Sequence, residues 1–368
     1  MKTSSYRPTA AAISTAAIEY NTRAFRDYIS PDSTLMAVVK ANGYGHGAVP
    51  AAKAAIRGGA TALGVAIMDE ALELRNAGFT EPLLVMGYTG GEEAIRQAAA
   101  HHITLTVFSE DVQEEMLRLA PDFKEPLKIH LKVDTGMGRI GVITEEKLLK
   151  LAAPLWKEPN IYVEGIFTHF AVADQADSPY TDEQFARFQE MYQALEDAGM
   201  PAAVKHCCNS AGTMLHPDKH LDMVRVGISL YGCRPDLEME LPFPIKPAME
   251  LSTEIVSLRP LTAGSTISYG RTHTLAADRL VATLPIGYAD GLPRLISNRF
   301  DADVNGAAAP VIGRVCMDQT MIDVTEIEAG LHDKVTFSID KIADVIGTIN
   351  YEIVCGISPR VPRLYDRE

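Results

Sequence analysis

Short apolar runs alternate with longer amphipathic segments over the first two-thirds of the 368-residue chain. The apolar runs are bounded mainly by Gly, Asp, Asn or Ser, as is typical of strands that enter turns. They predict eight strands, at Leu35–Val39, Ala62–Ile67, Pro82–Gly87, Ile103–Phe108, Leu127–Asp134, Val163–Phe170, Ala202–Asn209 and Met223–Tyr231.

Helical segments are predicted between these strands. Several of them begin with Ser or Thr followed by acidic residues, which suits a helix N-terminus. The predicted helices are Ser14–Tyr28, Ala48–Arg57, Met68–Ala77, Glu92–His101, Ser109–Leu119, Thr144–Lys157 and Thr181–Ala198.

Eight strands that alternate with helices indicate an α/β protein with a parallel sheet. Eight such units match a (β/α)8 or TIM barrel, which typically has about 250 residues. A doubly wound open sheet is the alternative, but it usually has fewer strands, and no GxGxxG follows an early strand here. We therefore predict a TIM barrel over residues 11–245.

The pattern changes after the Pro-rich segment PFPIKP near residue 245. Short strands punctuated by turn residues follow, with a helix only at Asp340–Gly347, so residues 246–368 are predicted to form a mostly β domain, with residues 1–10 as a candidate addition. The strands are predicted at Glu254–Leu258, Thr266–Tyr269, Leu280–Pro285, Pro310–Arg314, Gln319–Val324 and Asp333–Phe337.

Composition excludes several classes of protein. A net charge of −14 repels nucleic acids and anionic membranes, so neither is expected as a main partner. No apolar run approaches the ~18 residues of a membrane-spanning helix, and MKTSSYRPTA has no signal-peptide core, so we expect a cytoplasmic protein. The five cysteines form no CxxC pair, and we expect buried thiols and no metal site.

Lys40 comes directly after the apolar run LMAVV, at the end of the first predicted strand. In a barrel, functional residues lie at the C-terminal ends of strands. Two interpretations are open from this pattern. The side chain reaches the rim and stays charged, or partial burial frees its amine as a nucleophile that forms a Schiff base.

The fifth predicted strand carries several charged residues in KIHLKVDTGMGRIG. Alternation places Lys128, His130 and Lys132 on one face. Arg139 follows in a Gly-rich loop, and Asp134 is explained equally well by turn chemistry. Two cations near the barrel mouth, Lys132 and Arg139, require an anion, which is a substrate carboxylate, a phosphate or a modified lysine.

The last three strands add further polar residues at the same end. His169 ends the sixth strand, although a lone histidine in an apolar strand is more often a core residue. Ser210 after the seventh strand, and Gly227 and Ile228 in the eighth, match the phosphate site that barrels build from these loops. Arg225 lies in an otherwise apolar strand and must have a buried acceptor.

The sequence resembles the alanine racemase family of fold-type-III pyridoxal phosphate (PLP) enzymes. The resemblance covers essentially the whole chain and runs in order through both predicted domains. It is carried by AVVKANGYGHG, HLKVDTGMGRIGV, IFTHFAVAD, HCCNSAGT, RVGISLYG, ISYGRTH, PIGYADG, GRVCMDQTMIDV and RVPRLY.

This resemblance implies PLP-dependent interconversion of L- and D-alanine, which supplies D-alanine for cell-wall synthesis. It makes Lys40 the cofactor lysine and one base, and Tyr269 the base on the opposite face. Two bases are needed because the α-proton leaves one face and another returns to the other face. Arg225 would face the pyridine nitrogen.

The resemblance assigns further residues to the site. Cofactor contacts are implied for Tyr44, His169, Asn209, Ser210, Gly227 and Ile228, and substrate contacts for Arg139, Tyr288 and Met317. Lys132 aligns with a lysine that is carbamylated in many members, and an unmodified Lys132 paired with Asp134 is the alternative. Pro359 replaces a tyrosine that helps bind phosphate in some members.

The family also implies a head-to-tail homodimer, because its equivalents of Tyr269 and Met317 come from a different subunit than the cofactor lysine. Three alternatives remain for the function. One is a racemase of serine or of several amino acids, although Tyr269 and Tyr288 favour a small substrate. The others are a decarboxylase, against which Arg225 argues, and a non-catalytic PLP carrier, which would lack the second domain.

Overall fold

The computed structural model describes residues 6–366, and the chain divides into two compact units. One unit is Ala17–Lys246, and the other combines the described parts of Met1–Ala16 and Pro247–Glu368. The boundaries that we predicted for the two domains stay a prediction, and residues 1–5 of the candidate addition lie outside the described residues.

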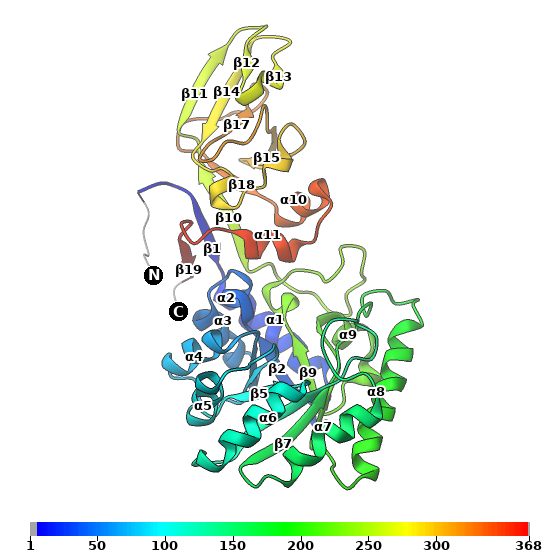
Figure 1. The fold of residues 1–368 in the computed structure, drawn as a ribbon. Helices are drawn as coiled ribbons and strands as arrows, with labels where there is room; N and C mark the ends of the chain where they lie inside the picture. The colour runs from blue at the N-terminus through cyan, green and yellow to red at the C-terminus, as the bar shows by residue number, and fades with distance from the viewer. Residues whose placement is uncertain (1–5, 367–368) are drawn as a thin grey trace. The chain divides into compact units, whose positions relative to one another are not determined.

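The first unit contains an eight-stranded parallel sheet in the order β8-β7-β6-β5-β4-β3-β2-β9 (Figure 1). Its strands are β2 (Thr34–Val38), β3 (Ala62–Val65), β4 (Leu83–Val85), β5 (Thr104–Val107), β6 (Leu127–Lys132), β7 (Ile161–Phe167), β8 (Val204–His206) and β9 (Met223–Val226). Backbone hydrogen bonds from Asp222 to Lys205 (3.2 Å) and from Arg225 to Cys208 (3.0 Å) join β8 to β9. The predicted TIM barrel is therefore confirmed.

The helices that connect the strands surround this sheet in Figure 1. They are α1 (Thr15–Tyr28), α2 (Lys40–Tyr44), α3 (Ala48–Arg57), α4 (Met68–Asn76), α5 (Glu92–Ala100), α6 (Glu110–Leu119), α7 (Glu145–Lys157), α8 (Tyr180–Asp197) and α9 (Ser210–Leu215). The predicted cap Thr144 accepts a hydrogen bond from the Lys147 N–H (3.3 Å). The predicted start of a helix at Thr181 is wrong by one residue, since α8 begins at Tyr180.

Two features of the barrel differ from the sequence pattern. The predicted eighth strand is too long, because Gly227 leaves the extended conformation (φ −116°, ψ −97°) and Ile228–Tyr231 forms a short 3-10 helix, η3. The register of β6 and β7 shifts between Ile129 and His130, because Glu164 of β7 is an extra residue there. Lys128 and His130 both contact Glu164, which agrees with the predicted common face, although Lys128 is exposed while His130 and Lys132 are buried.

The second unit is mostly β, as predicted. Three sheets occur, with orders β16-β15-β18-β10-β1-β19, β11-β14-β17 and β12-β13. Their strands are β1 (Ala10–Ile13), β10 (Met249–Glu254), β11 (Ser257–Leu261), β12 (Thr266–Ile267), β13 (His273–Thr274), β14 (Arg279–Leu284), β15 (Asp301–Val304), β16 (Ala307–Pro310), β17 (Thr320–Asp323), β18 (Lys334–Phe337) and β19 (Arg363–Tyr365). Two helices, α10 (Ile339–Ile346) and α11 (Asn350–Gly356), complete the unit.

The second unit also departs from the predictions. The single strand expected at Glu254–Leu258 is wrong, because β10 ends at Glu254 and β11 starts a different sheet at Ser257. The expected strand Pro310–Arg314 is displaced, since β16 ends at Pro310.

No helix in residues 6–366 is long and apolar enough to cross a membrane. Cys207 and Cys208 are buried, and both thiols donate to the carbonyl of Lys219 at 3.2 Å. The thiols are reduced core residues, as expected from their sequence context.

Candidate active site

Lys40 is held at the C-terminal end of β2 by a tight left-handed turn. The residues after it, Ala41 and Asn42, have φ values of 52° and 54°, which are unfavourable for residues with a Cβ. Hydrogen bonds compensate for this strain. The Ala41 N–H donates to Glu70 at 2.6 Å, and the Ala48 N–H donates to the side chain of Asn42 at 3.0 Å.

Tyr44, Ser210 and Gly227 converge close to this turn. The Gly227 N–H donates to Ser210 Oγ at 3.0 Å, and a Cβ at Gly227 would lie only 2.5 Å from the phenol oxygen of Tyr44. Ser210 begins α9 and Ile228 begins η3, and the first N–H groups of a helix have no acceptor within the helix. Hydroxyls and N–H groups in this arrangement fit a phosphate group.

Asn209, another predicted cofactor residue, is engaged in capping α9. Its Oδ1 accepts from the Gly212 N–H at 2.9 Å, and its Nδ2 donates to the Phe170 carbonyl at 3.5 Å. The side chain thus determines where α9 begins and where the hydroxyl of Ser210 lies.

Arg225 is the central cation of the barrel, with only 3% of its surface exposed. Its guanidinium donates to the Thr168 carbonyl (2.8 Å), the Cys207 carbonyl (3.1 Å), His206 Nδ1 (2.8 Å) and His169 Nδ1 (3.2 Å). Burial lowers its pKa to about 10, so the side chain remains a cation at neutral pH.

His169 accepts from Arg225 and is therefore not a separate core residue. Burial, together with the nearby cations Arg225 and Arg139, lowers its pKa well below the usual value. The imidazole is therefore neutral at pH 7, and its unprotonated Nδ1 accepts the hydrogen bond from the Arg225 guanidinium.

Lys132 is buried, and its Nζ donates to the Val133 carbonyl at 2.5 Å. Burial and the charge of Arg225 lower its pKa to about 7. The charge of Asp134 opposes this lowering through space, and the pairing of an unmodified Lys132 with Asp134 stays a prediction. The Asp134 carboxylate accepts four backbone N–H groups, of Gly136, Met137, Gly138 and Arg139, at 2.8–3.1 Å.

Arg139 lies in the loop that this carboxylate organises. Its side chain is exposed, and the described residues offer it no hydrogen-bond acceptor. Arg139 is thus a cation available to an anionic ligand.

The remaining predicted residues belong to the second unit and are exposed there. Exposed fractions are 71% for Tyr269, 52% for Met317 and 43% for Tyr288. Tyr269 follows Ser268, whose hydroxyl donates to the Arg314 carbonyl at 2.6 Å. Large apolar side chains this exposed are typical of surfaces that another molecule covers.

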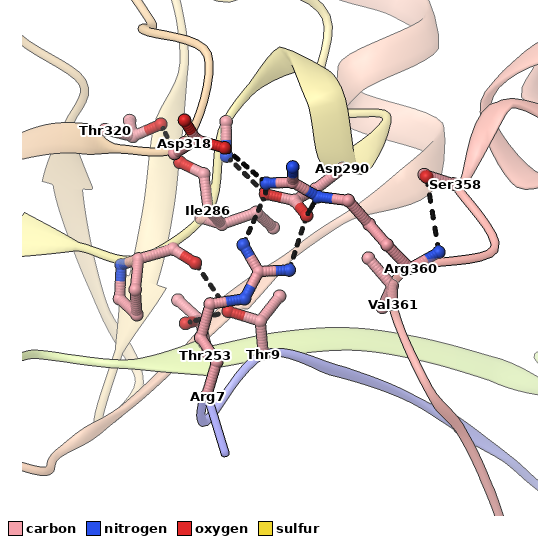
Figure 2. A network of polar contacts seen from close by, with 12 residues as sticks. Arg7, Thr9, Thr253, Ile286, Asp290, Asp318, Thr320, Ser358, Arg360 and Val361 are labelled. Atoms are coloured by element: carbon pink, nitrogen blue, oxygen red, sulfur yellow. Dashed lines mark hydrogen bonds and ion pairs between the residues drawn. The ribbon is translucent and has the colours of Figure 1, made fainter. Parts of the chain in front are cut away.

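A buried carboxylate connects the loops that carry Tyr288 and Met317 (Figure 2). Asp290 is fully buried and accepts from Arg7 (2.9 and 2.5 Å), Arg360 (2.6 and 3.3 Å) and the Gly287 N–H (2.9 Å). Burial on its own raises the pKa of Asp290, but the two arginines outweigh it and lower the pKa.

Arg360 extends this network to Asp318, the residue after Met317, at 2.6 Å (Figure 2). The two loops also bond directly, since the Tyr288 N–H donates to the Cys316 carbonyl at 3.0 Å. The sequence reasoning missed Arg7, Asp290 and Arg360, although the charged residues of RPT, YADG and RVPR were available as a signal.

Comparisons with known proteins identify the family of the chain. The family model for the alanine racemase N-terminal domain matches residues 13–235, and that for the C-terminal domain matches residues 248–365. The chain is 44% identical to alanine racemase 2 of Oceanobacillus iheyensis over 374 residues, covering 99% of this chain and 95% of that protein. It is also 44% identical to the alanine racemase of Desulforamulus reducens over 366 residues, covering 97% and 99%.

Solved structures show the same relationship. The crystal structure of alanine racemase from Bacillus anthracis with bound L-Ala-P is similar with a TM-score of 0.94 and 38% identity, covering 99% of this chain and 96% of that one. The alanine racemase of E. faecalis has the same TM-score and identity, with both chains fully covered. The resemblance inferred from the motifs is confirmed, and the chain belongs to the alanine racemase family.

Proposed function

We propose that this protein interconverts L-alanine and D-alanine with bound PLP, using Lys40 and Tyr269 as two opposed bases. One observation carries the proposal. This chain belongs to the family, and one end of its barrel holds Lys40 and the buried cation Arg225. The same end holds a cup formed by Tyr44, Ser210 and Gly227.

The residues of the barrel fit a phosphorylated pyridine. Tyr44, Ser210 and the N–H groups of Gly227 and Ile228 would hold the phosphate, and the amine of Lys40 would bind the aldehyde. Bound PLP supplies the electron sink that makes the α-proton of an amino acid acidic. Pro359 stands where some family members have a tyrosine that helps bind the phosphate, so this cup would hold the phosphate without that contact.

Proton movement is assigned to the two bases. Lys40 would hold the proton on the face that yields D-alanine, and Tyr269 would hold the one on the other face. Arg139 and the Met317 N–H would bind the substrate carboxylate. Tyr288 and Tyr269 would crowd the side chain of the substrate, which favours a methyl group.

Arg225 would set the reaction that follows proton removal. With a pKa of about 10, Arg225 would stay protonated, so it would donate to the pyridine nitrogen and would not accept a proton from it. A neutral ring is a weaker electron sink than a protonated one, so proton return at the α-carbon is favoured over transamination. A decarboxylase would instead be expected to present a carboxylate here.

The exposed Tyr269, Tyr288 and Met317 support a head-to-tail homodimer in which they complete the site around Lys40 of the other subunit. With alanine as substrate, the product would supply cell-wall synthesis in the cytoplasm.

A D-amino-acid oxidase-coupled assay on L-alanine, with and without added PLP, tests the proposal. We expect D-alanine formation that depends on PLP, and Tyr269→Phe should slow the exchange of the α-proton of L-alanine with solvent more than that of D-alanine. Faster turnover of L-serine or L-lysine would replace the alanine assignment by a broader racemase. Carbon dioxide release without inversion would identify a decarboxylase, and a PLP spectrum without turnover would identify a carrier.

A further inference from the structure

Arg225 is a buried cation, yet all the acceptors that the structure describes for its guanidinium are uncharged. They are two backbone carbonyls and the imidazoles of His169 and His206. A buried charge without a counter-charge is unfavourable, so the compensating negative charge must lie farther away.

A line of side-chain hydrogen bonds leads from Arg225 to a carboxylate. Arg225 Nη1 lies 2.8 Å from His206 Nδ1, and His206 Nε2 lies 2.7 Å from His130 Nδ1. His130 Nε2 then lies 3.3 Å from an oxygen of Glu164. The four side chains come from β9, β8, β6 and β7, so the line crosses the barrel interior.

The two ends of this line determine the direction of every hydrogen bond in it. Arg225 can only donate, so His206 Nδ1 accepts and its proton is on Nε2. That proton is donated to His130 Nδ1, which leaves the His130 proton on Nε2, directed at Glu164. A carboxylate can only accept, so Glu164 requires the His130 proton on Nε2. This is the same proton position that the donor Arg225 imposes from the other end.

The charge states agree with this assignment. Burial lowers the pKa of His130, and burial together with Arg225 lowers that of His206 well below its usual value, so both rings are neutral. Burial on its own raises the pKa of Glu164, but hydrogen bonds from His130 and Lys128 outweigh it and lower the pKa to about 2. The line therefore ends on an anion.

Packing holds both rings in these positions. The ring of Phe167 stacks on His206 with 4.7 Å between centroids and 6° between planes. Gly165 leaves room for the other ring, because a Cβ there would lie 2.7 Å from His130 Cε1. The register of β6 and β7 shifts between these residues, since Ile129 pairs with Val163 and His130 pairs with Gly165, which leaves Glu164 as the extra residue of β7.

We propose that Glu164, His130 and His206 form a relay that provides the counter-charge of Arg225 and orients its guanidinium. They are positioning residues, which contact neither substrate nor cofactor. The effect of the relay on catalysis rests on the proposed function of Arg225. The existence of the relay rests only on the hydrogen bonds between these side chains.

A double-mutant cycle on the full-length protein tests the charge coupling. Glu164→Gln should raise the unfolding equilibrium constant about tenfold in the wild-type background and clearly less in the Arg225→Gln background. Lys128→Gln is the matched control, because it removes the other partner of Glu164 but leaves the relay intact, and its effect should be the same in both backgrounds. Equal effects of Glu164→Gln in the two backgrounds would overturn the proposal.

A second measurement does not depend on the stability of any Arg225 variant. ¹⁵N NMR of the histidine-labelled holoprotein should show His130 and His206 as neutral rings protonated on Nε2, and a proton on either Nδ1 would overturn the relay. In activity assays, Glu164→Gln should lower kcat for L-alanine with little change in KM. An inactive wild-type protein would reject the proposed function, while the cycle and the NMR tautomers would still decide on the relay.

Discussion

At the scale of single residues, the phosphate cup depends on the missing side chain of Gly227. The Tyr44 phenol occupies the space that a Cβ would need, and the same glycine donates its N–H to Ser210. A methyl group at Gly227 would therefore displace the Tyr44 hydroxyl, which is proposed to bind the phosphate.

Gly227→Ala is expected to weaken PLP binding at least about tenfold, because Tyr44 must move out of the cup and charged hydrogen bonds are lost. Equilibrium titration of the apoprotein with PLP, followed by absorbance, measures the Kd. Gly356→Ala is the matched control, because a Cβ there meets nothing within 4 Å. Unchanged affinity in Gly227→Ala would show that Tyr44 is not a phosphate ligand.

Lys132 is the second residue with a testable chemical state. Its pKa of about 7 means that the amine is neutral above that pH and can react with carbon dioxide. A carbamate there would be an anion close to Arg139 and Arg225. We expect a ¹³C NMR carbamate signal in ¹³C-bicarbonate that grows between pH 6 and 8 and disappears in Lys132→Gln. Its persistence in Lys132→Gln, or its loss in Lys128→Gln, would place the carbamate elsewhere.

At the scale of elements, loops and strands are held by buried charges and by neutral histidines. Asp290 connects Arg7 before β1 with Arg360 before β19, and through Arg360 it reaches Asp318 (Figure 2). The loops with Tyr288 and Met317 therefore have their positions set by residues from both ends of the chain.

Asp290→Ala is expected to destabilise the protein by about 3 kcal/mol, because two arginines lose a buried partner. Asp318→Ala removes an exposed partner of the same Arg360 and should cost less than about 1 kcal/mol. Urea unfolding of both variants measures the difference. Similar losses of unfolding free energy in the two variants would show that the burial of Asp290 does not strengthen its ion pairs.

The barrel is expected to lose stability as the pH falls below about 6.5, the ordinary pKa of histidine. The folded-state pKa values of His130, His169 and His206 are lowered, so the unfolded chain takes up protons first. The stability from these neutral rings is present above that pH and decreases by about 1.4 kcal/mol per pH unit for each ring below it.

Urea unfolding between pH 5 and 7 measures this dependence. His206→Asn should make it shallower, whereas His332→Asn, which removes an exposed histidine, should leave it unchanged. An unchanged slope in His206→Asn would mean that this ring is not a neutral buried group.

At the scale of the whole molecule, the proposed site would combine Lys40 of one subunit with Tyr269 and Met317 of the other subunit. A head-to-tail dimer would cover the exposed aromatic and apolar side chains on that unit. Each of the two active sites would then be built from residues of both subunits.

Mixing two inactive variants tests this arrangement. In a fully exchanged equal mixture of Lys40→Ala and Tyr269→Phe, half of the dimers carry one intact site, so about a quarter of wild-type activity should return. Either variant mixed with itself is the control. No recovery, in a mixture whose subunits have demonstrably exchanged, would show that both bases come from one subunit.

The sequence by itself determined the parts of this protein that depend on local order. Eight apolar runs separated by helical segments were enough to predict the barrel, because strand and helix periodicities are properties of neighbouring residues. Lys40 and Ser210 were predicted at the barrel mouth for the same reason, since each directly follows a predicted strand, whereas Arg225 was recognised as a buried cation within an apolar strand. Short strands such as β1 and β15 were missed, because AAAI and DADV are only four residues long and consist mainly of Ala and Asp, which are weak strand formers.

Only the tertiary structure decided which charged groups meet. Asp134, the alternative partner of Lys132, accepts four backbone N–H groups of its own loop, which no local pattern indicated. The relay from Arg225 to Glu164 depends on the register shift between β6 and β7 and on side chains from four strands. The physical reason is distance along the chain: local patterns decide how a strand begins and ends, whereas hydrogen bonds between distant strands exist only after the barrel closes.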